Sequence, residues 1–128
     1  MTLLDEWWAF CSESQLMQRA CDQCEGRTFT LRRYCTDCFE EMSWTEAGDT
    51  GVVVTFSDVV ASSVTSALGN APYVVAYVDV GKARLLTNLI ASPASVRIGE
   101  VVRLVFRRSV TPPHRTVPLF QPVNGGSS

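Results

Sequence analysis

Histidine is almost absent from this chain of 128 residues, which contains a single one, His114. It follows two prolines, where a solvated loop residue is a simpler interpretation than a catalytic base. The sequence also lacks a glycine-rich phosphate loop, a nucleophile elbow and a repeated carboxylate–histidine set. Three serines fall in a small-residue segment with no base in sight: Ser62, Ser63 and Ser66. We therefore expect no catalytic residues and no enzyme activity from this chain alone.

Long apolar runs and an excess of basic residues are missing as well. No stretch approaches the roughly 20 apolar residues that a membrane-spanning helix needs. Residues 1–6 have neither a basic start nor an apolar signal core, so we expect a cytoplasmic protein with no membrane partner. The net charge is −2 and the pI is near 5.3. This balance disfavours nucleic acid as a partner, because general nucleic-acid binding needs a dense basic face.

Cysteine is the residue type that the chain does have in an informative pattern. Four of the five cysteines form two pairs, Cys21-Asp22-Gln23-Cys24 and Cys35-Thr36-Asp37-Cys38. Two intervening residues let both thiolates of a pair reach one ion, and a second pair completes a tetrahedral sulfur site suited to zinc. Ten residues separate the pairs, enough for a small hairpin over 27–33. Because four protein ligands leave no position for water, we expect a structural zinc.

Other uses of these cysteines fit the pattern less well. Disulfides need an oxidising compartment, which the pattern of residues 1–6 does not lead us to expect. A redox pair of this spacing would occur once, within a strand–helix context. Iron can replace zinc in a rubredoxin-like sulfur site. The fifth cysteine, Cys11, is interpreted as a half-buried helix residue.

An amphipathic helix is predicted from Leu3 to about Gln15, because apolar residues recur at spacings of three and four. Thr2 can cap it, and acidic residues in its first turn suit the helix dipole. Three large aromatic residues crowd this helix: Trp7, Trp8 and Phe10. They can pack on the rest of the chain or form a partner-docking face, since aromatic residues dominate interface energetics. We expect at least one of them to be mostly exposed.

The remaining sequence predicts short strands in two modules. Strands near 16–19, 28–31 and 44–46 frame the cysteines, and a turn-rich break follows at 47–51. Period-two patterns then predict strands over 52–60, 73–79, 84–90, 101–106 and 117–120, which suggests a small closed barrel. The predicted divisions are 1–15 for the helix, 16–47 for the ribbon, 48–122 for the barrel and 123–128 for a flexible tail. Phe56, Tyr73 and Tyr77 alternate with valines, and we expect the tyrosines to be structural core residues.

Arginines form two sets that could meet phosphate groups or simply keep the surface soluble. One set is in the ribbon hairpin, and the other is on the strand near 101–106 and at its end. The sets are Arg27, Arg32 and Arg33, and Arg103, Arg107 and Arg108.

Further motifs carry a resemblance to a known family. They are Pro72-Tyr73-Val74-Val75-Ala76, Arg84-Leu85-Leu86-Thr87-Asn88-Leu89, Val96-Arg97-Ile98-Gly99-Glu100-Val101-Val102 and Val117-Pro118-Leu119-Phe120-Gln121-Pro122. Together with the tryptophan-bearing helix and the cysteine pairs, they resemble the rubredoxin-like zinc-ribbon plus OB-fold proteins, domain-of-unknown-function family thirty-five, over roughly 3–122. The fold class that this implies is mainly β: an N-terminal amphipathic helix, a small zinc ribbon and a five-stranded OB-fold barrel.

The resemblance also implies a function. Members are non-catalytic subunits that accompany thiolase-fold enzymes, namely thiolases, lipid-transfer-type thiolases and steroid side-chain aldolases, which act on acyl-CoA. A hetero-oligomer with a thiolase-fold subunit is therefore expected, with acyl-CoA as a possible ligand and with zinc held by Cys21, Cys24, Cys35 and Cys38. The segment 30–34 lacks the prolines common in the family, and its Arg32 and Arg33 are candidate contacts for CoA phosphates. The alternative function is a nucleic-acid-binding ribbon–barrel protein.

Overall fold

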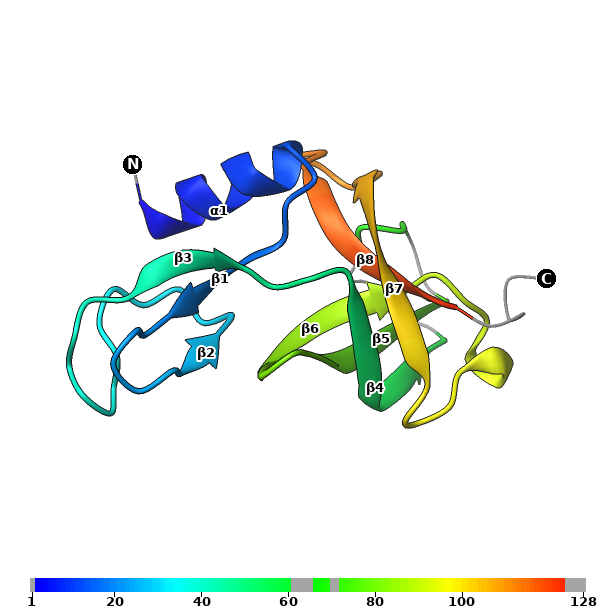
Figure 1. The fold of residues 1–128 in the computed structure, drawn as a ribbon. Helices are drawn as coiled ribbons and strands as arrows, with labels where there is room; N and C mark the ends of the chain where they lie inside the picture. Colours follow the sequence, from blue (N-terminus) through cyan, green and yellow to red (C-terminus); the bar gives the residue numbers. More distant parts are fainter. Residues whose placement is uncertain (1, 61–65, 70–71, 124–128) are drawn as a thin grey trace.

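The structure, a computed structural model, describes residues 2–60, 66–69 and 72–123. Apart from Val123, the predicted tail lies outside the described residues, as do Ser62 and Ser63. The elements are α1 (Leu3–Ser12), β1 (Met17–Ala20), β2 (Arg27–Thr28), β3 (Ser43–Glu46), β4 (Thr50–Val59), β5 (Tyr73–Val80), β6 (Ala83–Leu89), η1 (Pro93–Ser95), β7 (Val101–Arg108) and β8 (Thr116–Pro122) (Figure 1). No helix among these residues is long and apolar enough to cross a membrane.

Helix α1 begins where the sequence predicts and ends three residues early. The Thr2 side chain accepts a hydrogen bond from the Asp5 backbone N–H, and the Asp5 carboxylate accepts one from the Thr2 N–H, which completes a capping box. The helix stops at Ser12 rather than Gln15, because Ser14 adopts a left-handed φ of 60°. It lies across the top of the molecule, above β1 and β3 on one side and against β8 on the other (Figure 1).

The ribbon is a three-stranded antiparallel sheet with the order β2-β1-β3. Strand β2 has only two residues, shorter than the predicted 28–31. The ribbon has a very small core of its own, formed by Cys21, Cys35 and Met42 with Cys38 packed against them. Three of these four residues are paired cysteines, and the fourth is Met42. The centre of the ribbon is therefore the cysteine cluster itself.

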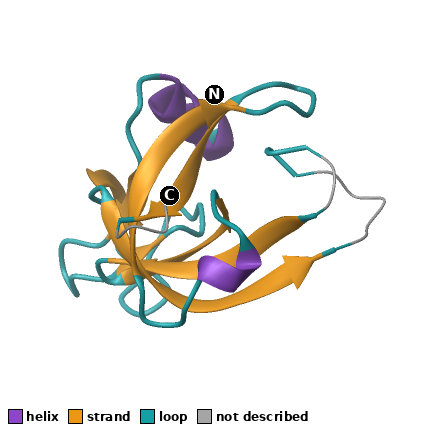
Figure 2. Ribbon diagram, turned by 90° about the vertical axis from the view of Figure 1, so that its right-hand side faces the viewer, coloured by secondary structure: helices purple, strands orange, loops and turns teal. Residues whose placement is uncertain are grey.

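The barrel is closed, with the strand order β4-β5-β6-β8-β7 and a final pairing of β7 with β4. Strands β6 and β8 pair in parallel, whereas the other four pairings in the barrel are antiparallel. This arrangement is OB-like, and it confirms the predicted fold class. Figure 2 shows the strands curving around the barrel with α1 above them. The buried core includes Leu16, which precedes β1, so the ribbon and the barrel share one hydrophobic cluster.

The expectation that both tyrosines of β5 are core residues is wrong. Val74, Ala76 and Val78 fill the barrel interior, and alternation along the strand turns Tyr73 and Tyr77 outward. Tyr77 is 44% exposed. Phe56 does pack against the core, because a register shift between residues 53 and 55 of β4 brings it opposite Ala76.

Candidate metal centre and the helix–ribbon surface

The four paired cysteines converge on one point. Their Sγ atoms all lie within 4.8 Å of one another, with 3.2 Å between Cys21 and Cys38 and 3.5 Å between Cys24 and Cys35. A tetrahedral zinc with bonds of about 2.3 Å separates its ligand sulfurs by about 3.8 Å, so the cluster has the size of such a site. A disulfide needs about 2.05 Å between sulfurs, and none of these pairs is that close. The geometry suits a metal ion.

Both cysteine turns are built in the same way. The Cys21 N–H donates to the Gly26 carbonyl at 3.0 Å, and the Cys35 N–H donates to the Glu40 carbonyl at 2.9 Å. The residue after the second cysteine of each pair has a left-handed backbone, with φ of 58° at Glu25 and 62° at Phe39. These left-handed residues turn the chain back after each pair, so that both thiols of a pair face the same point.

Backbone N–H groups aimed at the sulfurs favour the thiolate at the first cysteine of each pair. Hydrogen bonds from the backbone of Cys38 and Asp37 lower the pKa of Cys35 to about 7. The backbone N–H of Cys24 leads the causes that lower the pKa of Cys21. At Cys38 the Glu40 N–H also acts to lower the pKa, but hydrogen bonds with the neighbouring thiols and burial together raise it to about 12. Metal binding to this cluster therefore releases protons.

Arg19 is a structural residue of this site that the sequence analysis did not identify. Its side chain is almost completely buried, with Nε donating to the Arg32 carbonyl at 3.0 Å and Nη2 donating to the Met42 carbonyl at 2.7 Å. The guanidinium also lies 4.6 Å from the centre of the Trp44 ring. Arg19 thus ties β1 to the backbone on both sides of the second cysteine pair. The one signal in the sequence that could have indicated this role is the charge of Arg19 in an otherwise uncharged strand.

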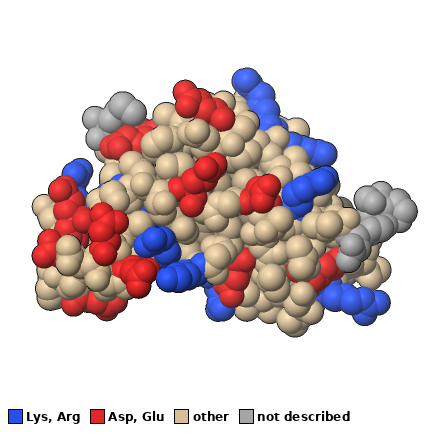
Figure 3. Space-filling view, viewed as in Figure 1, with Lys and Arg blue, Asp and Glu red and all other residues tan. Residues whose placement is uncertain are grey.

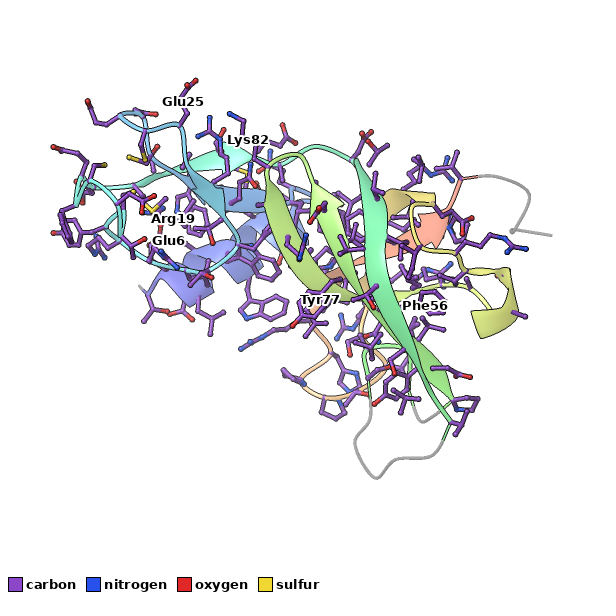
Figure 4. The ribbon with its side chains drawn as sticks, turned by 90° about the horizontal axis from the view of Figure 1, so that it is seen from below. Glu6, Arg19, Glu25, Phe56, Tyr77 and Lys82 are labelled. Carbon is purple, nitrogen blue, oxygen red and sulfur yellow. The ribbon has the colours of Figure 1, made fainter. Side chains whose placement is uncertain are left out.

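The helix joins the ribbon through two of its aromatic residues. Trp7 Nε1 donates to the Met17 carbonyl at 3.0 Å, and the Trp7 ring packs against the barrel core. Phe10 meets Trp44 edge to face, with 5.4 Å between ring centres. Trp44 Nε1 donates to the Glu6 carboxylate at 3.0 Å, so this contact is both apolar and polar. Figure 4 shows Glu6 and Arg19 close together between α1 and the ribbon.

The third aromatic residue, Trp8, faces the barrel side. It contacts Trp7 edge to face at 4.9 Å, and the Arg115 guanidinium lies 5.0 Å from the centre of its ring. None of Trp7, Trp8 and Phe10 is mostly exposed, so the expectation that at least one would be is wrong. The reason is that α1 lies across both the ribbon and the barrel, and each module covers part of its apolar face. A role of this helix in partner binding stays a prediction.

The candidate phosphate contacts lie beside the second cysteine pair. Arg32 is half-buried and its Nη1 donates to Thr36 Oγ1 at 3.0 Å, whereas exposed Arg33 lies 3.9 Å from the Glu41 carboxylate. The second arginine set is exposed on β7, in the other module (Figure 1). The structure therefore does not merge the two sets into one basic surface.

The side chains of the described residues that were weighed as catalytic candidates, His114 and Ser66, bond only to nearby backbone. His114 is exposed, and its Nδ1 lies 3.1 Å from the Ser109 carbonyl oxygen. Ser66 Oγ accepts a hydrogen bond from the Leu68 N–H within its own turn. Among the described contacts, neither His114 nor Ser66 takes part in a pairing of a nucleophile with a base.

A family model described as the C-terminal OB-fold domain of ChsH2 matches residues 44–107, which is half of the chain. The structure is similar to a solved chain of "Ltp2-ChsH2(DUF35) aldolase", with a TM-score of 0.79, 27% identity and 92% of each chain covered. A DUF35 protein of unknown function from Sulfolobus solfataricus has the same fold, with a TM-score of 0.66, 16% identity, and 94% of this chain and 84% of that chain covered. No curated protein sequence matches the chain.

Proposed function

The chain belongs to the ChsH2-type OB-fold family of DUF35 proteins, and on this premise we propose that it is a non-catalytic accessory subunit of a thiolase-fold enzyme acting on acyl-CoA. The observation that carries the proposal is the structural match over 92% of both chains to the Ltp2-ChsH2(DUF35) aldolase. The name of that protein pairs a DUF35 chain with a second protein, Ltp2, in an aldolase. A match over 92% of this chain extends well beyond the barrel, so it supports a role shared by more than the OB-like part.

We also propose that Cys21, Cys24, Cys35 and Cys38 hold a structural zinc. Their Sγ spacing suits a tetrahedral ion, and four thiolates leave no open position for substrate or water. When bound, the metal supplies folding free energy to a ribbon whose own core consists mainly of its ligands. The chain's residues then keep the second cysteine pair in place through Arg19, which bonds to the backbone at Arg32 and Met42.

The proposed role of the chain is to present a rigid surface to the partner subunit. The shared core around Leu16 and the contacts of α1 with both modules fix the ribbon against the barrel. The remaining exposed edges of Trp7, Trp8 and Phe10 are proposed to contribute to the contact with the partner. A hollow of about 230 Å³ along the helix, lined by Glu6, Ala9, Phe10 and Glu13, is open to such a contact.

A subordinate proposal concerns acyl-CoA. Arg32 and Arg33 are proposed to meet phosphate groups of CoA where the complex brings the ligand past the ribbon. The ion pair of Arg33 with Glu41 is exposed and long, so it contributes little and leaves the guanidinium able to turn to a phosphate. The exposed acidic neighbours Asp37, Glu40 and Glu41 oppose an anion at this position, so a phosphate there would need both guanidinium groups.

Co-purification tests the proposed role. We expect the full chain, expressed with a tag in its own host, to bring down a thiolase-fold protein in stoichiometric amount and to elute with it in gel filtration. Recovery of nucleic acid in place of that protein, with tight binding of single-stranded DNA or RNA at low salt in a fluorescence titration, would support the alternative function. Recovery of neither would contradict the proposal.

A further inference from the structure

The ribbon carries two large apolar side chains that are mostly exposed among the residues that the structure describes. Phe39, directly after Cys38, is 77% exposed, which is the highest value among the large hydrophobic residues described as exposed. Tyr34, directly before Cys35, is 56% exposed and pairs in an isolated β-bridge with Glu41. Neither belongs to a hydrophobic cluster formed by the described residues. The two aromatics therefore flank the second cysteine pair and face solvent.

The backbone at Phe39 makes this exposure more informative. Its φ is 62°, in the left-handed region where glycine is the default residue and a bulky side chain is an outlier. The cysteine turn requires this conformation, because the Phe39 N–H donates to the Cys35 carbonyl at 2.9 Å. Phenylalanine is thus a costly choice here, and its side chain, 77% exposed, gains little burial within the chain in return. Strain of this kind points from the residue to a function outside the fold.

The charges around Phe39 indicate what kind of surface it meets. Asp37, Glu40 and Glu41 are all exposed beside it. Residues 1–47 carry nine Asp and Glu against four Arg, whereas residues 48–128 carry four against seven Lys and Arg. Figure 3 shows Asp and Glu gathered at the ribbon end of the molecule, with Lys and Arg more frequent at the barrel end. An acidic end repels nucleic acid and anionic membranes, and it attracts a basic protein surface.

We propose that Phe39, with Tyr34 beside it, is the anchor by which the ribbon docks into an apolar pocket with a basic rim on a partner protein. This inference rests on the proposed function, in which the partner is a thiolase-fold subunit. Aromatic anchors that fill a partner's pocket dominate interface energetics, and a surrounding rim of opposite charge speeds association. The anchor lies at the ribbon and is separate from the aromatic residues of α1.

The test replaces Phe39 with residues that suit its backbone. Phe39→Gly and Phe39→Asn both fit a left-handed position. We expect both variants to bind metal as the wild type does and to unfold at an equal or higher temperature. We expect their affinity for the purified thiolase-fold subunit identified by co-purification to fall by roughly 10–100-fold in calorimetry, the range typical of interface anchors.

The first cysteine pair supplies a matched control. Glu25 occupies the equivalent left-handed position, at φ 58°, and Figure 4 shows it at the upper edge of the ribbon in that view. Glu25→Gly relieves the same backbone strain without removing an aromatic residue, so it should leave the affinity within about twofold of the wild type, as expected for a contact outside the anchor. Slower association at higher salt is also expected, because screening weakens attraction between opposite charges.

The outcomes separate the anchor from the proposed function. If the wild type binds the thiolase-fold subunit and both Phe39 variants bind equally well, the anchor is wrong and the accessory role stands. An equal loss of affinity in Glu25→Gly would also overturn the anchor, because the effect would then belong to the ribbon as a whole. If the wild-type chain binds no thiolase-fold subunit, both the accessory role and the anchor are contradicted.

Discussion

Cysteine occupies two opposite environments in this protein. Cys11 is fully buried in α1, and burial raises the pKa of its thiol to about 12. Cys21 and Cys35 instead receive backbone hydrogen bonds that lower their pKa. The same residue type is therefore an inert apolar side chain at one position and a thiolate ready for a metal ion at others.

Replacing any one of the four clustered cysteines by serine should unfold the ribbon. The expected result is loss of bound zinc together with a lower soluble yield, because the metal site is most of the ribbon's core. Metal analysis of the purified protein and circular dichroism measure both effects. Cys11→Ser is the matched control and should keep one metal ion per chain. Metal-free wild-type protein, with folded cysteine variants, would show that the cluster is not a metal site.

The Cys11 thiol should stay unreactive at pH 8 in the folded protein. Its pKa is raised from the ordinary value of 9.0 to about 12, so it remains protonated there and is a poor nucleophile. Its contribution to stability should be complete below pH 9 and be lost as the pH rises toward 12, because the unfolded chain gives up this proton first. Iodoacetamide labelling with peptide mapping, in buffer and in denaturant, measures the protection. Rapid labelling of Cys11 in the native protein would contradict the buried environment.

At the scale of elements, α1 and the ribbon depend on each other through a short series of contacts. Glu6 accepts from Trp44, and Trp44 stacks beneath Arg19, which in turn holds the backbone next to the second cysteine pair. The Phe10 ring also contacts the Trp44 ring, edge to face. A helix of ten residues is marginal alone, so these contacts and the capping box explain why it forms.

Arg19→Ala should destabilise the ribbon by about 3 kcal/mol, because two carbonyl groups lose a charged donor. Arg19→Lys should recover only part of this loss, since an ammonium group lacks the planar fork that reaches both carbonyls. Chemical denaturation followed by tryptophan fluorescence measures the difference. Equal stability of the wild type and the alanine variant would mean that Arg19 does not hold the hairpin.

The predictability of these elements differs for physical reasons. The cysteine spacing, the Thr2 cap and the period-two strands are local signals, and each led to the right element type. Which face of β5 points into the barrel was not predictable. Apolar residues occupy both of its faces, and alternation alone does not say which face is inside. The burial of Arg19 was not predictable either, since its partners lie 13 and 23 residues away.

For the whole molecule, the important feature is that the three parts form one body with two differently charged ends. Leu16 joins the barrel core although it precedes the first ribbon strand, and α1 spans both modules. The ribbon end is acidic and the barrel end is basic. A rigid body with this polarity suits a subunit that docks in one orientation, which is the role proposed here.

Turnover by the thiolase-fold partner is the most direct test of that role. The purified partner is assayed on an acyl-CoA substrate in three conditions: without the chain, with the wild-type chain, and with the chain after metal removal. The chain is also assayed without the partner. We expect no turnover by the chain alone and a higher yield or activity of the partner when the intact chain is present. Robust acyl-CoA turnover by the chain alone, or a partner equally stable and active without it, would contradict the accessory role.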